Sequence, residues 1–93
     1  MADIDLIRSH STGLDGGRET VEAVAQKLEN KLGVQYEWDD DNTLAFEGQG
    51  AEGQIDVQPD TIRIRIHLSA FLRPMTDQLE KKAETYLDEY IED

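Results

Sequence analysis

The sequence predicts a single α+β domain, in which a five-stranded antiparallel sheet carries two helices on one face. Five short segments alternate apolar and polar residues, which is the pattern of a half-buried strand. Two longer segments repeat apolar residues at the helical spacing of about 3.6. The 93 residues are enough to bury one core and too few for two, so residues 1–93 are expected to form one domain.

The N-terminal part is predicted as a strand followed by a helix. Residues 3–10 form the strand, because Ile4 and Leu6 alternate with aspartates. Residues 14–32 form the helix, because their apolar side chains fall on one stripe. The stripe consists of Leu14, Val21, Val24, Ala25, Leu28 and Leu32.

The ends of this helix carry residues that are typical of helix caps. Thr12 followed by Asp15 is a variant of the capping box, in which side chains accept hydrogen bonds from free backbone N–H groups. Gly33 is placed to adopt the left-handed conformation that often ends a helix. Gly16 and Gly17 each cost about 1 kcal/mol relative to alanine, so we expect the first turn to fray.

Four further strands follow with short connections, which predicts a meander of successive hairpins. The segments are residues 34–38, 43–48, 51–58 and 61–68. The polar run 39–42 and the pair Pro59-Asp60 have the composition of turns. Gly50 and Gly53 indicate a bend or a bulge near the start of the third of these segments.

The charges on the last strand predict the strand order. Arg63 and Arg65 alternate with isoleucines and should face solvent, and a two-residue loop at 59–60 would place Asp56 and Gln54 opposite them. The first strand carries two aspartates that would flank these arginines from the other side, Asp3 and Asp5. Opposite charges on neighbouring strands are stabilising. We therefore expect the order 1-5-4-3-2, with one face exposed to water and both helices on the other.

The C-terminal segment, residues 74–91, is predicted as a second amphipathic helix. Pro74 suits its first turn, and Phe71 with Leu72 is expected to form a short turn before it. Its apolar stripe consists of Met75, Leu79, Ala83, Tyr86, Leu87, Tyr90 and Ile91.

The composition excludes several classes of function. The formal net charge is −12, and residues 34–60 hold eight acids and no lysine or arginine, which argues against nucleic acid and anionic membranes as partners. The acidity is interpreted first as a solubility device and second as a docking face for a basic partner. There is no cysteine, which excludes disulfides and thiolate metal sites and fits a cytoplasmic location. We expect no secretory signal and no transmembrane segment.

No catalytic or metal site is recognisable, so we expect a non-enzymatic protein without a cofactor. His10 and His67 are interpreted as surface or edge histidines, because neither shares a motif with a nucleophile and an orienting group. The acidic run 39–42 fails as a calcium loop, because Leu44 and Gly50 occupy the positions of the required glycine and glutamate. It is interpreted as a polar turn, with weak cation binding as the alternative.

The aromatic side chains are predicted to line the dry face of the sheet. They are interpreted first as core residues, and the alternative is an apolar groove between the sheet and the C-terminal helix. The candidate groove residues are Tyr36, Trp38, Phe46, Leu79, Tyr86 and Tyr90. Tyrosine hydroxyls need polar partners, so Tyr86 and Tyr90 are expected at its rim.

Short motifs along almost the whole chain resemble the polyhydroxyalkanoic acid granule-region family. These are the segment 10–14 followed by Arg18, the segments 36–38 and 44–46 of the central hairpin, the segment 50–55, and Leu68 followed by Phe71 and Leu72. Gly17 stands where the family usually has alanine. The architecture also resembles a shortened helix-grip domain, whose longer relatives hold apolar ligands under the C-terminal helix.

The resemblance implies an accessory protein of the bacterial storage-polyester system, in the cytoplasm or at the granule surface, and no catalytic residues. Its partner would be a granule-associated protein or the polyester surface. A protein partner is favoured, because polymer binding requires exposed apolar area and the periodicity shows none. The alternative is a small-ligand binding module that uses the candidate groove. The sequence leaves the oligomeric state open.

Overall fold

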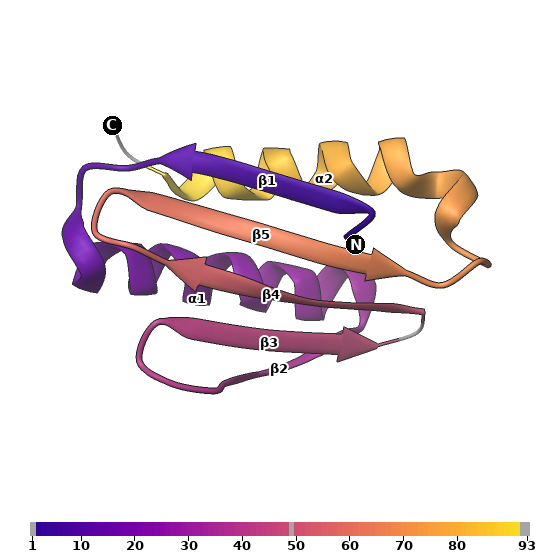
Figure 1. Cartoon of the computed structure of the whole chain (residues 1–93), viewed down its shortest axis with the longest axis horizontal. Helices are drawn as coiled ribbons and strands as arrows, with labels where there is room; N and C mark the ends of the chain where they lie inside the picture. Colours follow the sequence, from indigo (N-terminus) through magenta and orange to yellow (C-terminus); the bar gives the residue numbers. More distant parts are fainter. Residues whose placement is uncertain (1, 49, 92–93) are drawn as a thin grey trace.

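The computed structural model describes residues 2–48 and 50–91, which form one antiparallel sheet and two helices (Figure 1). The order of elements is the predicted one. The elements are β1 (Ile4–Ser9), α1 (Gly13–Leu32), β2 (Gln35–Trp38), β3 (Thr43–Gly48), β4 (Ala51–Val57), β5 (Thr61–Leu68), the short 3-10 helix η1 (Arg73–Met75) and α2 (Thr76–Tyr90).

The strand order β1-β5-β4-β3-β2 is confirmed, with every neighbouring pair antiparallel. The register between β4 and β5 is also the predicted one, because Asp56 lies opposite Arg63 and Gln54 lies opposite Arg65. Asp3 was expected to flank Arg63 and Arg65 on the uncovered face, and this prediction was wrong. Asp3 precedes β1, and its carboxylate accepts the backbone N–H of Leu68 at 2.7 Å. Of the two aspartates, only Asp5 therefore meets the arginines.

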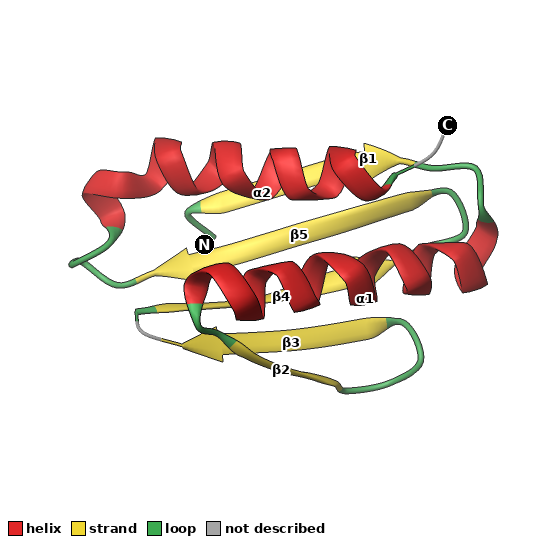
Figure 2. Ribbon diagram, turned by 180° about the vertical axis from the view of Figure 1, so that it is seen from behind, coloured by secondary structure: helices red, strands yellow, loops and turns green. Residues whose placement is uncertain are grey.

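Both helices cover the same face of the sheet (Figure 2). In Figures 1 and 2, α1 lies over β4, between β5 and β3, while α2 lies over β1. The inward side chains of β1, β3, β4 and β5 and the facing sides of both helices form one buried cluster, and those of β2 pack against it partly buried. In β5 this cluster takes Ile62, Ile64, Ile66 and Leu68, as the alternation predicts. Two residues of the predicted helix stripes were wrong, because Leu14 is 37% exposed and Met75 is 44% exposed.

The two ends of α1 differ from each other in how well they were predicted. At the C-terminal end, Gly33 has φ of 72° and its N–H donates to the Glu29 carbonyl at 3.0 Å, which confirms the glycine cap. At the N-terminal end the capping box is wrong, because the Thr12 side chain makes no hydrogen bond to the helix backbone. The Thr12 hydroxyl instead lies 3.2 Å from Nδ1 of His10.

Gly17 and Gly53 are needed for close packing. Gly17 is buried, and a Cβ atom there would lie 2.7 Å from Cγ1 of Val57, so the first turns of α1 pack tightly on β4. The expected bulge at Gly53 is absent, because pairing runs continuously on both sides of this residue. A Cβ atom at Gly53 would meet the ring of Phe46 at 2.8 Å and the backbone carbonyl of Arg65. Glycine at 53 therefore lets the neighbouring strand place an aromatic ring over it.

The C-terminal helix begins two residues later than predicted. Residues 73–75 form η1, which contains Pro74, and α2 begins at Thr76. The backbone N–H of Met75 donates to the Leu72 carbonyl at 2.9 Å, as a 3-10 turn requires. Within the described residues, neither α-helix has the length and apolar character that crossing a bilayer would require.

Candidate functional site

The predicted groove residues fall into two groups that the structure does not bring together. Tyr36, Trp38 and Phe46 lie on β2 and β3, at the side of the sheet that α1 covers. The other group, Leu79, Tyr86 and Tyr90, lies on α2. Because α1 stands between β2 and α2, these side chains do not line one groove. Ligand binding by either group stays a prediction.

The aromatic residues of β2 are tied to α1 by one carboxylate. The indole Nε1 of Trp38 donates to Oε1 of Glu22 at 3.4 Å. Hydrogen bonding to Glu22, together with desolvation, raises the pKa of the Tyr36 hydroxyl. Tyr36 and Trp38 therefore fasten the edge strand β2 to α1.

Tyr86 and Tyr90 are half-buried on α2, and Tyr90 borders a hollow of about 230 Å³ beside the first half of α1.

His10 is buried, with 6% of its surface exposed, so the surface interpretation was wrong. The alternative of an edge position fits better, because His10 directly follows β1, an edge strand. Its Nε2 atom lies 2.9 Å from the carbonyl oxygen of Gln58. A carbonyl oxygen only accepts, so Nε2 carries the proton and Nδ1 accepts the backbone N–H of Thr12 at 3.4 Å. His10 therefore joins the start of α1 to the end of β4. His67, in contrast, is exposed on β5.

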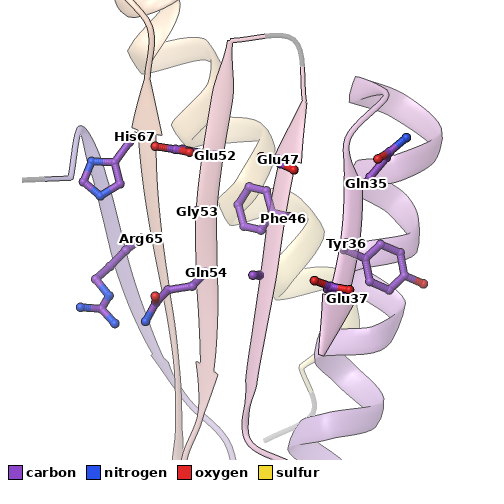
Figure 3. A pocket seen from close by; sticks show the side chains of 11 residues that line it. Gln35, Tyr36, Glu37, Phe46, Glu47, Glu52, Gly53, Gln54, Arg65 and His67 are labelled. Carbon is purple, nitrogen blue, oxygen red and sulfur yellow. The ribbon is translucent and has the colours of Figure 1, made fainter. Parts of the chain in front are cut away.

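The uncovered face of the sheet is hollowed over β2 to β5 (Figure 3). We call this the open-face hollow, and its volume is about 570 Å³. It is lined by Gln35, Tyr36, Glu37, Ala45, Phe46, Glu47, Glu52, Gly53, Gln54, Arg65 and His67. Ala45 lies between Glu37 and Gln54 in the register and is the shortest outward side chain of the three. A small residue among long neighbours leaves room for a group from outside.

Charges beside the hollow, on β1, β5 and β4, are paired within the chain. The guanidinium of Arg63 donates to both oxygens of Asp5, at 3.0 and 2.7 Å. Arg65 donates from Nη2 to Asp56 at 2.7 Å. The hydrogen bond from Arg63 lowers the pKa of the Asp5 carboxyl below its ordinary value.

Charges on the β2 to β4 side of the hollow are not paired. Glu37, Glu47 and Glu52 take part in no ion pair with any residue of the described part of the chain. Glu47 and Glu52 are direct register partners on β3 and β4. Like charges in this position repel each other and destabilise the pair of strands. The sequence signal for this pair was the short connection between the two strands, which fixes their register.

A second notable surface is the apolar tip between β5 and α2. Phe71 is 84% exposed and Met75 is 44% exposed. Leu72, between them in sequence, packs against the core and holds the segment to the sheet. The periodicity assigned Met75 to the buried stripe of the C-terminal helix, and this failed because Met75 belongs to η1, before α2 begins. We call Phe71 and Met75 the apolar tip.

The acidic turn 39–42 is held by its own hydrogen bonds. Oδ1 of Asp40 accepts the backbone N–H of Asn42 at 2.8 Å, as in an Asx turn. The backbone N–H of Asp39 donates to the Thr43 carbonyl at 2.8 Å. Among the described residues, no three His, Asp or Glu side chains are placed to hold a metal ion.

The structure defines a small α+β domain with two exposed surfaces of unusual character, one acidic and one apolar. The model of the family described as "Putative polyhydroxyalkanoic acid system protein" matches residues 4–91. The chain belongs to this family. No curated protein and no solved structure matches the chain significantly.

Proposed function

We propose that this protein is a non-enzymatic accessory protein of the bacterial polyhydroxyalkanoate granule system, which binds a partner protein at the granule surface in the cytoplasm. Family membership supports the connection with the polyester system. The observation that carries the binding role is the apolar tip.

The apolar tip has the properties of a binding anchor. An exposed phenylalanine forgoes about 1.5–3 kcal/mol that burial of its side chain would contribute. Its loop is held by backbone hydrogen bonds, from Ser69 N–H to the Gly50 carbonyl at 2.7 Å and from Leu72 N–H to the Ser69 carbonyl at 2.9 Å. An exposed aromatic on an ordered loop loses little entropy when a partner buries it, which is typical of interface hot spots.

The size of the tip favours a protein partner over direct contact with the polyester. Two side chains can fill a pocket on a partner protein. Adhesion to a polymer surface needs a wider apolar patch. Beside the tip, Arg73 lies 3.8 Å from the carboxylate of Asp3, so a charged pair borders it. A polar rim around an apolar anchor is the usual anatomy of a protein interface.

Co-sedimentation with isolated granules tests the proposal. We expect the protein to pellet with untreated granules, and to stay in solution with granules stripped of their proteins. Phe71→Ala should reduce pelleting by about tenfold or more, as loss of an interface hot spot does. Ile7→Ala is the matched control, because Ile7 is also an exposed apolar residue but lies on β1, outside the tip.

Two outcomes would contradict parts of the proposal. Absence from both pellets would remove the granule role. Equal pelleting with stripped and untreated granules would replace the protein partner by the polyester surface.

A further inference from the structure

The open-face hollow carries negative charge that the chain does not neutralise. Glu47 and Glu52 face each other across β3 and β4, and Glu37 lies on the next strand. Residues 34–60, which include β2, β3 and β4, contain no lysine or arginine. The three strands therefore cannot balance these carboxylates themselves.

Of the residues that the structure describes, two basic side chains line the hollow, Arg65 and His67, and neither forms an ion pair with the three glutamates. Arg65 borders the hollow, but its guanidinium is bound to Asp56 at 2.7 Å. His67 is the register partner of Glu52, and no ion pair joins the two residues. Within the described residues, Glu37, Glu47 and Glu52 therefore have no ion-pair partner on the sheet.

The opposed glutamates at 47 and 52 depart from what would be most stable locally. Directly opposed like charges destabilise a sheet, and a glutamine at either position would remove the repulsion without changing shape. Proteins keep such departures from local stability rules chiefly at functional sites. On the same face, Asp5 and Asp56 each have an arginine partner. Among the described residues of this face, the carboxylates without an ion pair are those that line the hollow.

We propose that the open-face hollow docks a lysine- or arginine-bearing segment of a partner protein. The aliphatic part of such a side chain would lie over Ala45, and its charged head would lie among Glu37, Glu47 and Glu52. Figure 3 shows these carboxylates and Gln54 on neighbouring strands of the hollow. This docking goes beyond the granule role, does not depend on it, and uses a different surface from the apolar tip.

Charge decides between the possible occupants. Nucleic acid and anionic lipid would be repelled by the carboxylates. A second copy of this chain carries the same net charge of −12 and would be repelled as well. A basic peptide segment is the macromolecular ligand whose charge and side-chain shape both fit.

The test is a titration of the full chain, at low salt and above neutral pH, with a short blocked peptide of alternating arginine and alanine. Backbone amide NMR shifts should change at β2, β3 and β4, and added salt should weaken binding. A glutamate–alanine peptide should give no shifts. The double variant Glu47→Gln/Glu52→Gln should bind at least about tenfold more weakly.

The matched control removes the same charge elsewhere. Glu19→Gln/Asp77→Asn changes two exposed acids, one on α1 and one on α2, and its affinity should stay within about twofold of the parent. Equal weakening by both double variants, or shifts spread over all acidic surfaces, would overturn the proposal. So would the absence of binding by a folded parent chain. The peptide titration involves no granules, so it can fail while the granule role holds, and the reverse is equally possible.

Discussion

Arg63 and Ile64 are neighbours in the chain and lie on opposite faces of the sheet. Ile64 is 1% exposed and packs beneath the helices, whereas Arg63 reaches across the uncovered face to Asp5. On the covered face almost every position is decided by burial of apolar area. On the uncovered face packing decides little, so residues there can be retained for binding at some loss of stability. The opposed glutamates at 47 and 52 accordingly lie on the uncovered face.

The largest effect expected from this comparison concerns two isoleucines. Ile64→Ala should lower the free energy of unfolding by about 2–5 kcal/mol, because it leaves a cavity in the core. Ile7→Ala, on the uncovered face and 55% exposed, should change it by no more than about 0.5 kcal/mol. Urea unfolding followed by the fluorescence of Trp38 measures both. Equal losses would mean that the two faces are not distinct.

A smaller loss is expected where α1 approaches the covered face most closely. Gly17→Ala should gain about 1 kcal/mol in helix propensity and lose about 1–3 kcal/mol through contact with Val57 and His10. The expected net effect is destabilising by up to about 2 kcal/mol. In a Val57→Ala background the substitution should cost less, because the closest contact is gone. A net gain of stability in the parent chain would contradict the tight packing.

On the uncovered face, one substitution should have the opposite sign. Glu47→Gln should raise the free energy of unfolding by about 0.2–1 kcal/mol, because it removes the repulsion with Glu52. Glu19→Gln, an exposed acid in the second turn of α1, is the control and should not raise stability. Chemical unfolding at low salt measures the difference, which should shrink as salt is added. A loss of stability in Glu47→Gln would show that this carboxylate has a favourable partner.

The smallest expected effect is a pH dependence from Asp5. Arg63 lowers the pKa of this carboxyl below its ordinary value of 3.8, so the group binds its proton more weakly in the folded chain. Its stabilising contribution is present above that value and is lost as the pH falls through the lowered pKa. Asp5→Asn should flatten this part of the acid-unfolding profile. Asp77→Asn, an exposed control on α2, should leave it unchanged.

Much of the fold could be predicted because its signals are local. The alternation of isoleucine and arginine in β5 assigned the faces, and the two-residue turn at 59–60 fixed the register of Asp56 and Arg63. Asp5 on the first strand was expected beside the arginines of β5, and this placed β1 next to β5 in the strand order. The aspartate at position 3 failed as evidence, because β1 begins one residue later and its carboxylate turns to the end of β5.

The features that sequence reasoning missed depend on contacts between distant segments. The burial of His10 requires the Gln58 carbonyl, which is forty-eight positions away in the chain. The need for glycine at position 17 appears only when α1 is docked on β4. The sequence also predicted one apolar groove between the sheet and the C-terminal helix, and no periodicity states which helix covers which strands. The opposed glutamates at 47 and 52 are an exception, because they are close in the chain and the register of their hairpin would have revealed them.

The most direct test of the account measures which side chains of β5 reach water. The chain has no cysteine, so single cysteines can be introduced one at a time and reacted with a thiol reagent under native conditions. Arg63→Cys and His67→Cys should react rapidly, whereas Ile62→Cys and Ile64→Cys should react only through unfolding. Rapid reaction at positions 62 and 64 with protection at 63 and 67 would contradict the assignment of the two faces, and with it the docking surface.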